Sequence, residues 1–195
     1  MGTINLKRAI IILLMIGIMV IISGCARWPD GPGPGPGPGE TDYQLEITVE
    51  VEGIIDFNDG MYYIVMDADG NSATGPDYDI SFWDDRFYYI KLEEGFFYFA
   101  QKEEGSPELY LAASLISGNM IQVTIALSDL EDPNSIDINV VTTDSDNNTY
   151  DHLDGYFTIN TTVLGSTGEG VISGGGTGGA DFDIIKATAV VTTLY

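Results

Sequence analysis

One polar segment, directly after an apolar run at residues 61–66, concentrates side chains that offer oxygen ligands. Carboxylate and amide oxygens are the ligands that calcium prefers, and the ion takes six to eight of them. The segment departs from the EF-hand pattern, because Ser72 stands in place of its glycine and Tyr78 in place of its glutamate. We therefore expect a calcium site of another kind; the alternative is a polar turn whose side chains cap their own backbone. The expected ligands are Asp67, Asp69, Asn71, Asp77 and Asp79.

A second acidic segment repeats this composition more loosely and is a further candidate for calcium. His152 lies within it, and in such an acidic turn we expect a surface histidine rather than a catalytic acid or base. The oxygen-bearing residues of the segment are Asp144, Asp146, Asn147, Asn148, Asp151 and Asp154.

Aromatic side chains are concentrated from residue 78 to residue 99, where 10 of the 21 aromatic residues lie. Neighbouring residues of a strand point to opposite faces of its sheet, so the runs at 87–89 and 96–99 send rings to both faces. An exposed row of rings can stack against sugars, and we expect a ligand-binding face formed by Trp83, Tyr88 and Tyr98. The alternative is a sheet that is buried on both sides, in which these rings belong to the core.

The overall charge excludes several classes of function. The 195 residues include 30 acidic and 7 basic side chains, a net charge of -23, so the chain lacks the basic surface that neutralises nucleic-acid phosphates. Gly174, Gly176 and Gly179 match a nucleotide-binding pattern, but no lysine accompanies them and no helix is expected after them, so we predict no nucleotide. One histidine and one cysteine leave little for a catalytic triad or a metal centre built on these residues, and we predict that the protein is not an enzyme.

The first 24 residues have the composition of an export signal. Lys7 and Arg8 precede an uncharged, mostly apolar stretch at 9–22, which is shorter than the roughly 20 residues that cross a bilayer as a helix. The stretch ends in Ile22-Ser23-Gly24-Cys25, which resembles the lipobox of prokaryotic lipoproteins. This resemblance implies cleavage before Cys25 and a diacylglyceryl thioether on its sulfur, often with a further acyl chain such as palmitate. The protein would then be anchored in the cell membrane, facing the extracytoplasmic side; the alternative is an uncleaved anchor helix.

Residues 25–42 are predicted to form a linker after the lipidated cysteine. Glycine and proline alternate from Gly31 to Gly39. Each proline removes a backbone donor and each glycine adds conformational freedom, so we expect a disordered and partly extended tether.

Residues 43–195 are predicted to form one all-β domain. Apolar and polar residues alternate strictly from Tyr43 to Val51, which is typical of a half-buried strand. A single helical turn is expected at 128–132, and a mobile glycine-rich loop at 165–179. Similar runs separated by turn-forming residues predict a single antiparallel two-sheet β-sandwich of about nine strands. These runs lie at 43–51, 61–66, 87–92, 96–101, 109–115, 120–127, 136–142, 156–163 and 184–194.

The order of several segments in this domain resembles the family 9 carbohydrate-binding modules and the DOMON group of secreted sandwich domains. The segments are Asp67-Ala68-Asp69-Gly70-Asn71, the turn Thr74-Gly75-Pro76, the aromatic block around Trp83 and the run at 121–130. The sugar-binding members of this group imply a face of aromatic platforms with structural calcium. The domain departs from them in having one tryptophan where such a sugar clamp uses two.

Together these features predict a membrane-anchored extracytoplasmic lipoprotein that displays a non-catalytic β-sandwich. The sandwich is expected to bind a carbohydrate or a similar extracellular ligand. The alternative is a structural or protein-interaction surface domain without a small-molecule site. The expected partners are the membrane, through the lipid on Cys25, and a glycan or a surface protein, with no nucleic acid.

Overall fold

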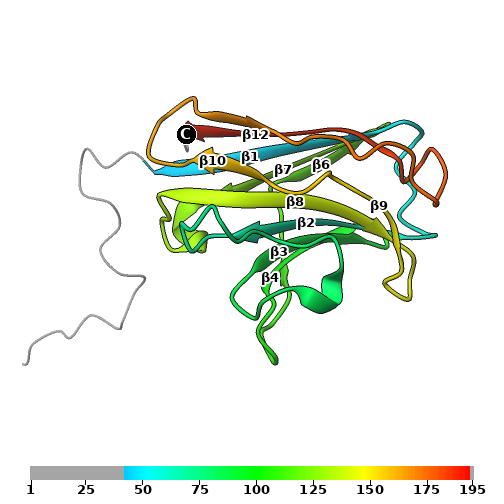
Figure 1. The fold of residues 1–195 in the computed structure, drawn as a ribbon, viewed down its shortest axis with the longest axis horizontal. Helices are drawn as coiled ribbons and strands as arrows, with labels where there is room; N and C mark the ends of the chain where they lie inside the picture. Colours follow the sequence, from blue (N-terminus) through cyan, green and yellow to red (C-terminus); the bar gives the residue numbers. More distant parts are fainter. Residues whose placement is uncertain (1–41, 194–195) are drawn as a thin grey trace, which may run out of the picture. The chain divides into compact units, whose positions relative to one another are not determined.

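The computed structural model describes residues 42–193, which form two antiparallel β-sheets and two short 3-10 helices (Figure 1). The predicted all-β fold with two antiparallel sheets is confirmed. The strands are β1 (Tyr43–Val51), β2 (Met61–Asp67), β3 (Tyr88–Glu93), β4 (Phe96–Gln101), β5 (Leu109–Tyr110), β6 (Ser114–Ser117), β7 (Met120–Ala126), β8 (Ser135–Thr143), β9 (Thr149–His152), β10 (Phe157–Asn160), β11 (Thr167–Glu169) and β12 (Ile184–Thr193), and the 3-10 helices are η1 (Ile80–Phe82) and η2 (Leu127–Leu130).

Three sequence predictions concern residues outside this range. The signal peptide at 1–24, the lipidation site at Cys25 and all of the linker except Asp42 lie outside the described residues. In residues 42–193, no helix has the length and apolar character needed to cross a membrane.

One sheet has the strand order β11-β12-β1-β7-β6, with β1 at its centre. β1 pairs with β12 from Tyr43 to Val51 and with β7 from Gln44 to Glu50, so its backbone is hydrogen-bonded along both edges. The buried residues of β1 alternate with half-exposed ones, as the sequence pattern predicts. This sheet is therefore covered by the other sheet on one face only.

The second sheet has the order β10-β8-β2-β3-β4-β5, and β9 also pairs with β8. β10 pairs with residues 135–138 and β9 with residues 141–143, so these two strands share one edge of β8. All seven residues of β2 are buried. The segment that carries η1 covers the outer face of β2, and Figure 1 shows this segment as a loop below the lower sheet.

The two sheets face each other across the main core. Ile47 and Val123 from the first sheet and Ile64, Leu92 and Ile138 from the second belong to one buried cluster. Full burial of a side chain of this size contributes about 1.5–3 kcal/mol. A second, smaller core lies on the outer face of the second sheet and consists of Met61, Tyr63, Val65, Trp83, Phe87 and Val141.

The strand count exceeds the predicted nine because one predicted run divides and two strands carry little sequence signal. The run at 109–115 forms β5 in one sheet and β6 in the other, so the chain changes sheets between them. β9 lies inside the second acidic segment, and β11 lies inside the glycine-rich segment. The single helical turn expected at 128–132 is present as η2, which begins one residue earlier and ends two residues earlier.

The glycine-rich segment at 165–179, predicted as a mobile loop, is attached to the sandwich at several points. β11 pairs with β12, Leu153 forms a bridge with Ile172, and the Thr177 N–H donates to the Tyr150 carbonyl at 2.9 Å. A Cβ at Gly178 would lie 2.5 Å from the Tyr150 ring. These glycines thus allow the segment to approach β9 closely.

Candidate functional site

The carboxylates of the first acidic segment cap the backbone of their own turn. Asp67 Oδ1 accepts from the Asp69 N–H at 3.0 Å, and Asp69 Oδ1 accepts from the Asn71 N–H at 2.7 Å. Asp77 and Asp79 accept in the same way from the N–H groups two residues ahead, at 2.9 Å each. This is the arrangement that the polar-turn alternative predicts. Within residues 42–193 no three His, Cys, Asp or Glu side chains are placed to hold a metal ion, so the calcium site stays a prediction.

Two buried carboxylates lie side by side behind this segment. Asp67 on β2 and Asp137 on β8 are register partners, and their side chains are 4% and 3% exposed. Burial raises the pKa of each carboxyl above its ordinary value, although Asp137 also accepts a hydrogen bond from Thr158. Asp67 lines a cleft of about 220 Å³ that also contains Arg86 and Glu131. The raised pKa of Asp67 in this cleft marks a polar site. Of the calcium ligands predicted from the sequence, Asp67 and Asp69 line the cleft, whereas Asn71, Asp77 and Asp79 do not.

The second acidic segment contains two separate arrangements. Asp144 Oδ1 accepts from the N–H groups of Asp146 and Asn148, both at 2.8 Å, so it closes a turn. The Asn148 side-chain amide also donates to Asp144 Oδ2 at 2.7 Å, and this bond, followed by the backbone bonds, lowers the pKa of Asp144. Asp151 instead points inward and accepts from the Ser173 hydroxyl at 3.0 Å and the Ile184 N–H at 2.7 Å. It is therefore a structural anchor for the segment that precedes β12.

The three residues predicted to bind a ligand do not share one exposed face. Trp83 is 6% exposed, and its Nε1–H donates to the Asp77 carbonyl at 2.7 Å. Tyr88 turns toward the main core and stacks on Phe99, with ring centroids 5.8 Å apart. Tyr98 lies on the opposite, outer face of the same sheet, because it alternates with Phe99 along β4. Trp83 thus belongs to the buried core, as the alternative predicts, whereas Tyr88 and Tyr98 are both half-buried and lie on opposite faces of the sheet. Tyr88 lines the cleft beside Asp67, and Tyr98 faces outward.

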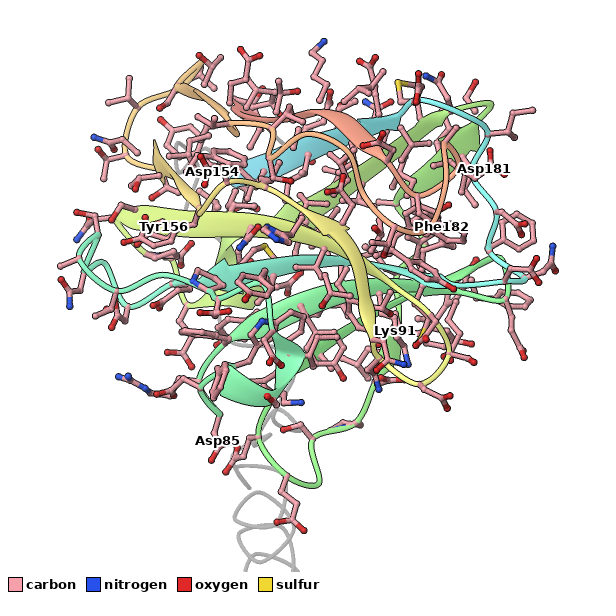
Figure 2. The ribbon with its side chains drawn as sticks, turned by 45° about the vertical axis from the view of Figure 1, so that its right-hand side comes forward. Asp85, Lys91, Asp154, Tyr156, Asp181 and Phe182 are labelled. Carbon is pink, nitrogen blue, oxygen red and sulfur yellow. The ribbon has the colours of Figure 1, made fainter. Side chains whose placement is uncertain are left out.

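Tyr98 belongs to a different group of aromatic residues, at the edge of the second sheet. In the register of β3, β4 and β5, Lys91 lies opposite Tyr98 and Tyr98 lies opposite Tyr110. Phe96 is two residues from Tyr98 on the same face, and its ring meets the Tyr110 ring edge-on at 6.5 Å. Phe96 is 51% exposed and Tyr110 is 66% exposed. We call Phe96, Tyr98 and Tyr110 the aromatic face; Figure 2 shows Lys91 on this side of the molecule, away from β1 and β12.

Charged groups border the aromatic face. The Lys91 ammonium lies 2.9 Å from carboxylate oxygens of both Glu93 and Glu108, and 5.5 Å from the centre of the Tyr98 ring. Burial alone would lower the pKa of Lys91, but the hydrogen bonds and charges of the two glutamates raise it above its ordinary value. The Tyr89 hydroxyl donates to Glu108 at 2.9 Å, and burial together with this bond raises the pKa of Tyr89 to about 12. Lys91 thus stays charged and fixes both carboxylates beside the rings.

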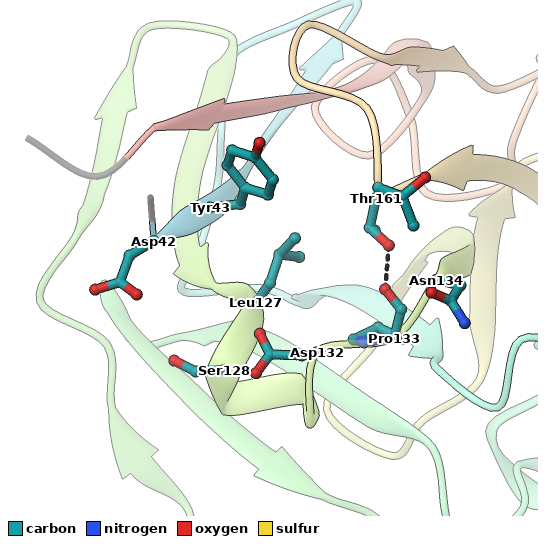
Figure 3. A pocket seen from close by; sticks show the side chains of 9 residues that line it. Asp42, Tyr43, Leu127, Ser128, Asp132, Pro133, Asn134 and Thr161 are labelled. Atoms are coloured by element: carbon teal, nitrogen blue, oxygen red, sulfur yellow. Dashed lines mark hydrogen bonds between the residues drawn. The ribbon is translucent and has the colours of Figure 1, made fainter. Parts of the chain in front are cut away.

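A larger hollow, of about 360 Å³, lies near the start of β1 (Figure 3). Tyr43 and Leu127 line it together with Asp132, and the Thr161 hydroxyl donates to the Pro133 carbonyl at its rim. Asp132 has a left-handed backbone, with φ of 51°, directly after Glu131 with φ of 64°. The hollow is lined mainly by polar groups and contains one aromatic ring, so it lacks the row of rings on which sugars stack.

Phe96 and Tyr110 are not among the site residues predicted from the sequence, although both lie in segments predicted to be strands. The run of alternating rings at 96–99 shows that Phe96 and Tyr98 share a face. Tyr110 joins them only because β5 pairs with β4, which the sequence pattern does not specify. Chemically, the aromatic face offers flat apolar rings beside fixed carboxylates, an arrangement suited to binding. No protein-family model, curated protein or solved structure matches the chain.

Proposed function

We propose that the protein is a membrane-anchored extracytoplasmic lipoprotein whose non-catalytic β-sandwich binds a carbohydrate on the aromatic face. The lipid on Cys25 would hold it at the membrane, and the glycine-proline linker would separate the domain from the surface. The N-terminal sequence pattern supports the anchor, and the exposed rings support the ligand. Mass spectrometry of the mature protein tests the anchor: we expect loss of residues 1–24 and a diacylglyceryl mass on Cys25, and an unmodified Cys25 contradicts it.

The exposed pair of Phe96 and Tyr110 is the observation that carries the binding proposal. Two large rings at 51% and 66% exposure leave apolar surface in water, and they lie next to the half-buried ring of Tyr98. Sugar rings combine apolar C–H faces with hydroxyl groups at their edges. The aromatic rings would pack against the C–H faces, and the carboxylates of Glu93 and Glu108 would accept hydrogen bonds from the hydroxyl groups.

A glycan array probed with the mature chain, followed by calorimetric titration of the best ligand, tests the proposal. We expect Phe96→Ala and Tyr110→Ala each to weaken binding about tenfold, which corresponds to about 1.4 kcal/mol. Phe82→Ala is the matched control, because Phe82 is 72% exposed but lies in η1 rather than in β4 or β5. Equal losses in Phe82→Ala and Phe96→Ala, or no glycan bound at all, contradict the proposal.

The same rings also fit the alternative of a protein-interaction domain. Tyrosine and phenylalanine are enriched in the buried centres of protein interfaces, and Leu109 adds a further exposed apolar side chain at 57%. This alternative predicts that Tyr110→Ala abolishes capture of one defined surface protein in cross-linking on intact cells. It also predicts that the glycan array stays empty.

A further inference from the structure

The cationic hydrogen-bond donor beside the aromatic face, the Lys91 ammonium, is already used within the protein. The Lys91 ammonium contacts Glu93 Oε2 and Glu108 Oε1, and the Tyr89 hydroxyl donates to Glu108 Oε1. The Lys91 side chain is only 12% exposed, whereas those of Glu93 and Glu108 are 41% and 37% exposed. Besides the hydroxyls of Tyr98 and Tyr110, the face therefore presents carboxylate oxygens and no free cationic donor, and a ligand that binds these carboxylates must itself supply the donors.

The surroundings of the aromatic face are also negatively charged. Glu94 follows β3, and Glu103 and Glu104 follow β4, and all three are exposed. The other nearby base, Lys102, has its ammonium 6.0 Å from the centre of the buried Trp83 ring. Of the 30 acidic residues of the chain only Asp30 and Glu40 lie outside residues 42–193, a range that holds 28 acidic and 4 basic residues. This field repels anionic ligands and attracts cationic ones.

Exposed aromatic rings add a second attraction for cations. The negative face of a phenyl or phenol ring attracts an ammonium group within about 6 Å of its centre. Lys91 already occupies one such position over Tyr98, which shows that the site accommodates an ammonium beside a ring. The rings of Phe96 and Tyr110 are the more exposed pair and would serve a ligand in the same way.

We propose that the ligand of the aromatic face is a glycan that carries protonated amino groups, such as a chain of de-N-acetylated amino sugars. This inference rests on the proposed function and specifies its ligand class. The sugar rings would pack on Phe96 and Tyr110, and the ammonium groups would donate to Glu93 and Glu108. A glycan with carboxylate or sulfate groups would face repulsion at the same position.

The first test compares three oligosaccharides of equal length on the mature chain, at about pH 5.5 so that amines are protonated. The probes are glucosamine, N-acetylglucosamine and galacturonate oligomers. We expect the glucosamine oligomer to bind at least tenfold more tightly than the N-acetylated one, with the advantage shrinking as salt is raised. The galacturonate oligomer is expected not to bind. Equal affinity for the glucosamine and N-acetylated oligomers overturns this inference and leaves the proposed function intact, whereas no binding of any glycan overturns both.

The second test removes single charges. Glu93→Gln and Glu108→Gln are expected to weaken glucosamine-oligomer binding about three- to tenfold and to leave N-acetylated binding unchanged. Glu169→Gln is the matched control, because it removes one charge from β11 in the other sheet. An equal loss in Glu169→Gln overturns the assignment to this face. Unchanged melting temperatures in all three variants exclude misfolding as the cause of any loss.

A competition experiment distinguishes a glycan from a protein ligand. An oligolysine of equal charge that binds more tightly and displaces the sugar overturns the glycan in favour of a basic protein.

Discussion

Asp151 ties three parts of the domain together through one buried carboxylate. Asp151 is 3% exposed. Its Oδ1 accepts from the Ser173 hydroxyl at 3.0 Å, and its Oδ2 accepts from the Ile184 N–H at 2.7 Å. β9 is thereby joined to the glycine-rich segment and to the first residue of β12. Substitution of Asp151 is expected to loosen all three at once.

The size of the effect follows from these two bonds. A hydrogen bond to a charged acceptor contributes about 1.5–3 kcal/mol, so Asp151→Ala is expected to cost about 3–5 kcal/mol. It also leaves the N–H of Ile184, a fully buried residue, without its acceptor. For a domain of this size, each kcal/mol lowers the melting temperature by about 2–4 °C, so a decrease of about 6–20 °C is expected. Asp151→Asn keeps one acceptor oxygen, and we expect an intermediate loss.

Urea denaturation followed by circular dichroism measures this free energy of unfolding directly. The matched control is Asp154→Ala, three residues later, where the exposed side chain makes no hydrogen bond among residues 42–193; its effect is expected to stay within about 0.5 kcal/mol. Limited proteolysis beside apolar residues adds a local readout, because loosening frees Ile172, which is half-buried and bridged to Leu153, for cleavage. A loss below about 1 kcal/mol for Asp151→Ala at an unchanged m value, with cleavage unchanged, refutes the reasoning.

Three further predictions follow from the buried and capped residues. The chain has two tryptophans, and a Trp28→Phe variant leaves the fluorescence of Trp83 alone. We expect the emission of a buried indole that stays unchanged when glycan saturates the aromatic face. A ligand-dependent shift of the emission contradicts our placement of the site. Asp137→Asn is expected to raise the melting temperature at pH 7 but not near pH 3. Burial raises the pKa of Asp137 in the folded state. The stability that this carboxyl contributes is therefore fully present below its ordinary pKa of about 3.9 and is lost as pH rises through the raised pKa. Equal effects of Asp137→Asn at both pH values contradict this reasoning. Because the carboxylates at 67–79 cap their own backbone, EDTA is expected to leave the melting temperature unchanged, whereas a decrease that calcium reverses supports the calcium site.

The fold class was predictable because its signals are local. The alternation from Tyr43 to Val51 shows in any single stretch of sequence, and the same period marks β7 and β12. β9 gives no such signal, because only its pairing with β8 makes Thr149–His152 a strand. β11 is hidden by glycines that permit its close approach to Phe157.

The site was only partly predictable, because burial on the outer face of a sheet depends on what covers it. Trp83 and Tyr98 both carry aromatic rings in the same block, yet the segment around η1 encloses Trp83 in a second core and leaves the edge strands uncovered. Likewise, turn-capping and metal binding use the same aspartates at the same spacing, as the hydrogen bonds of Asp67 and Asp69 show. Sequence pattern alone does not distinguish these outcomes.

The central position of β1 determines how the domain responds to mechanical force. The described chain enters the domain through Asp42 directly into β1, which is bonded on one side to β12 and on the other to β7. In an antiparallel ladder the hydrogen bonds run perpendicular to the strands, so a pull along β1 loads the bonds of both ladders together. Extraction of β1 by tension from its N-terminal end would require these two ladders to shear at once, so the strand that follows the predicted linker resists such extraction.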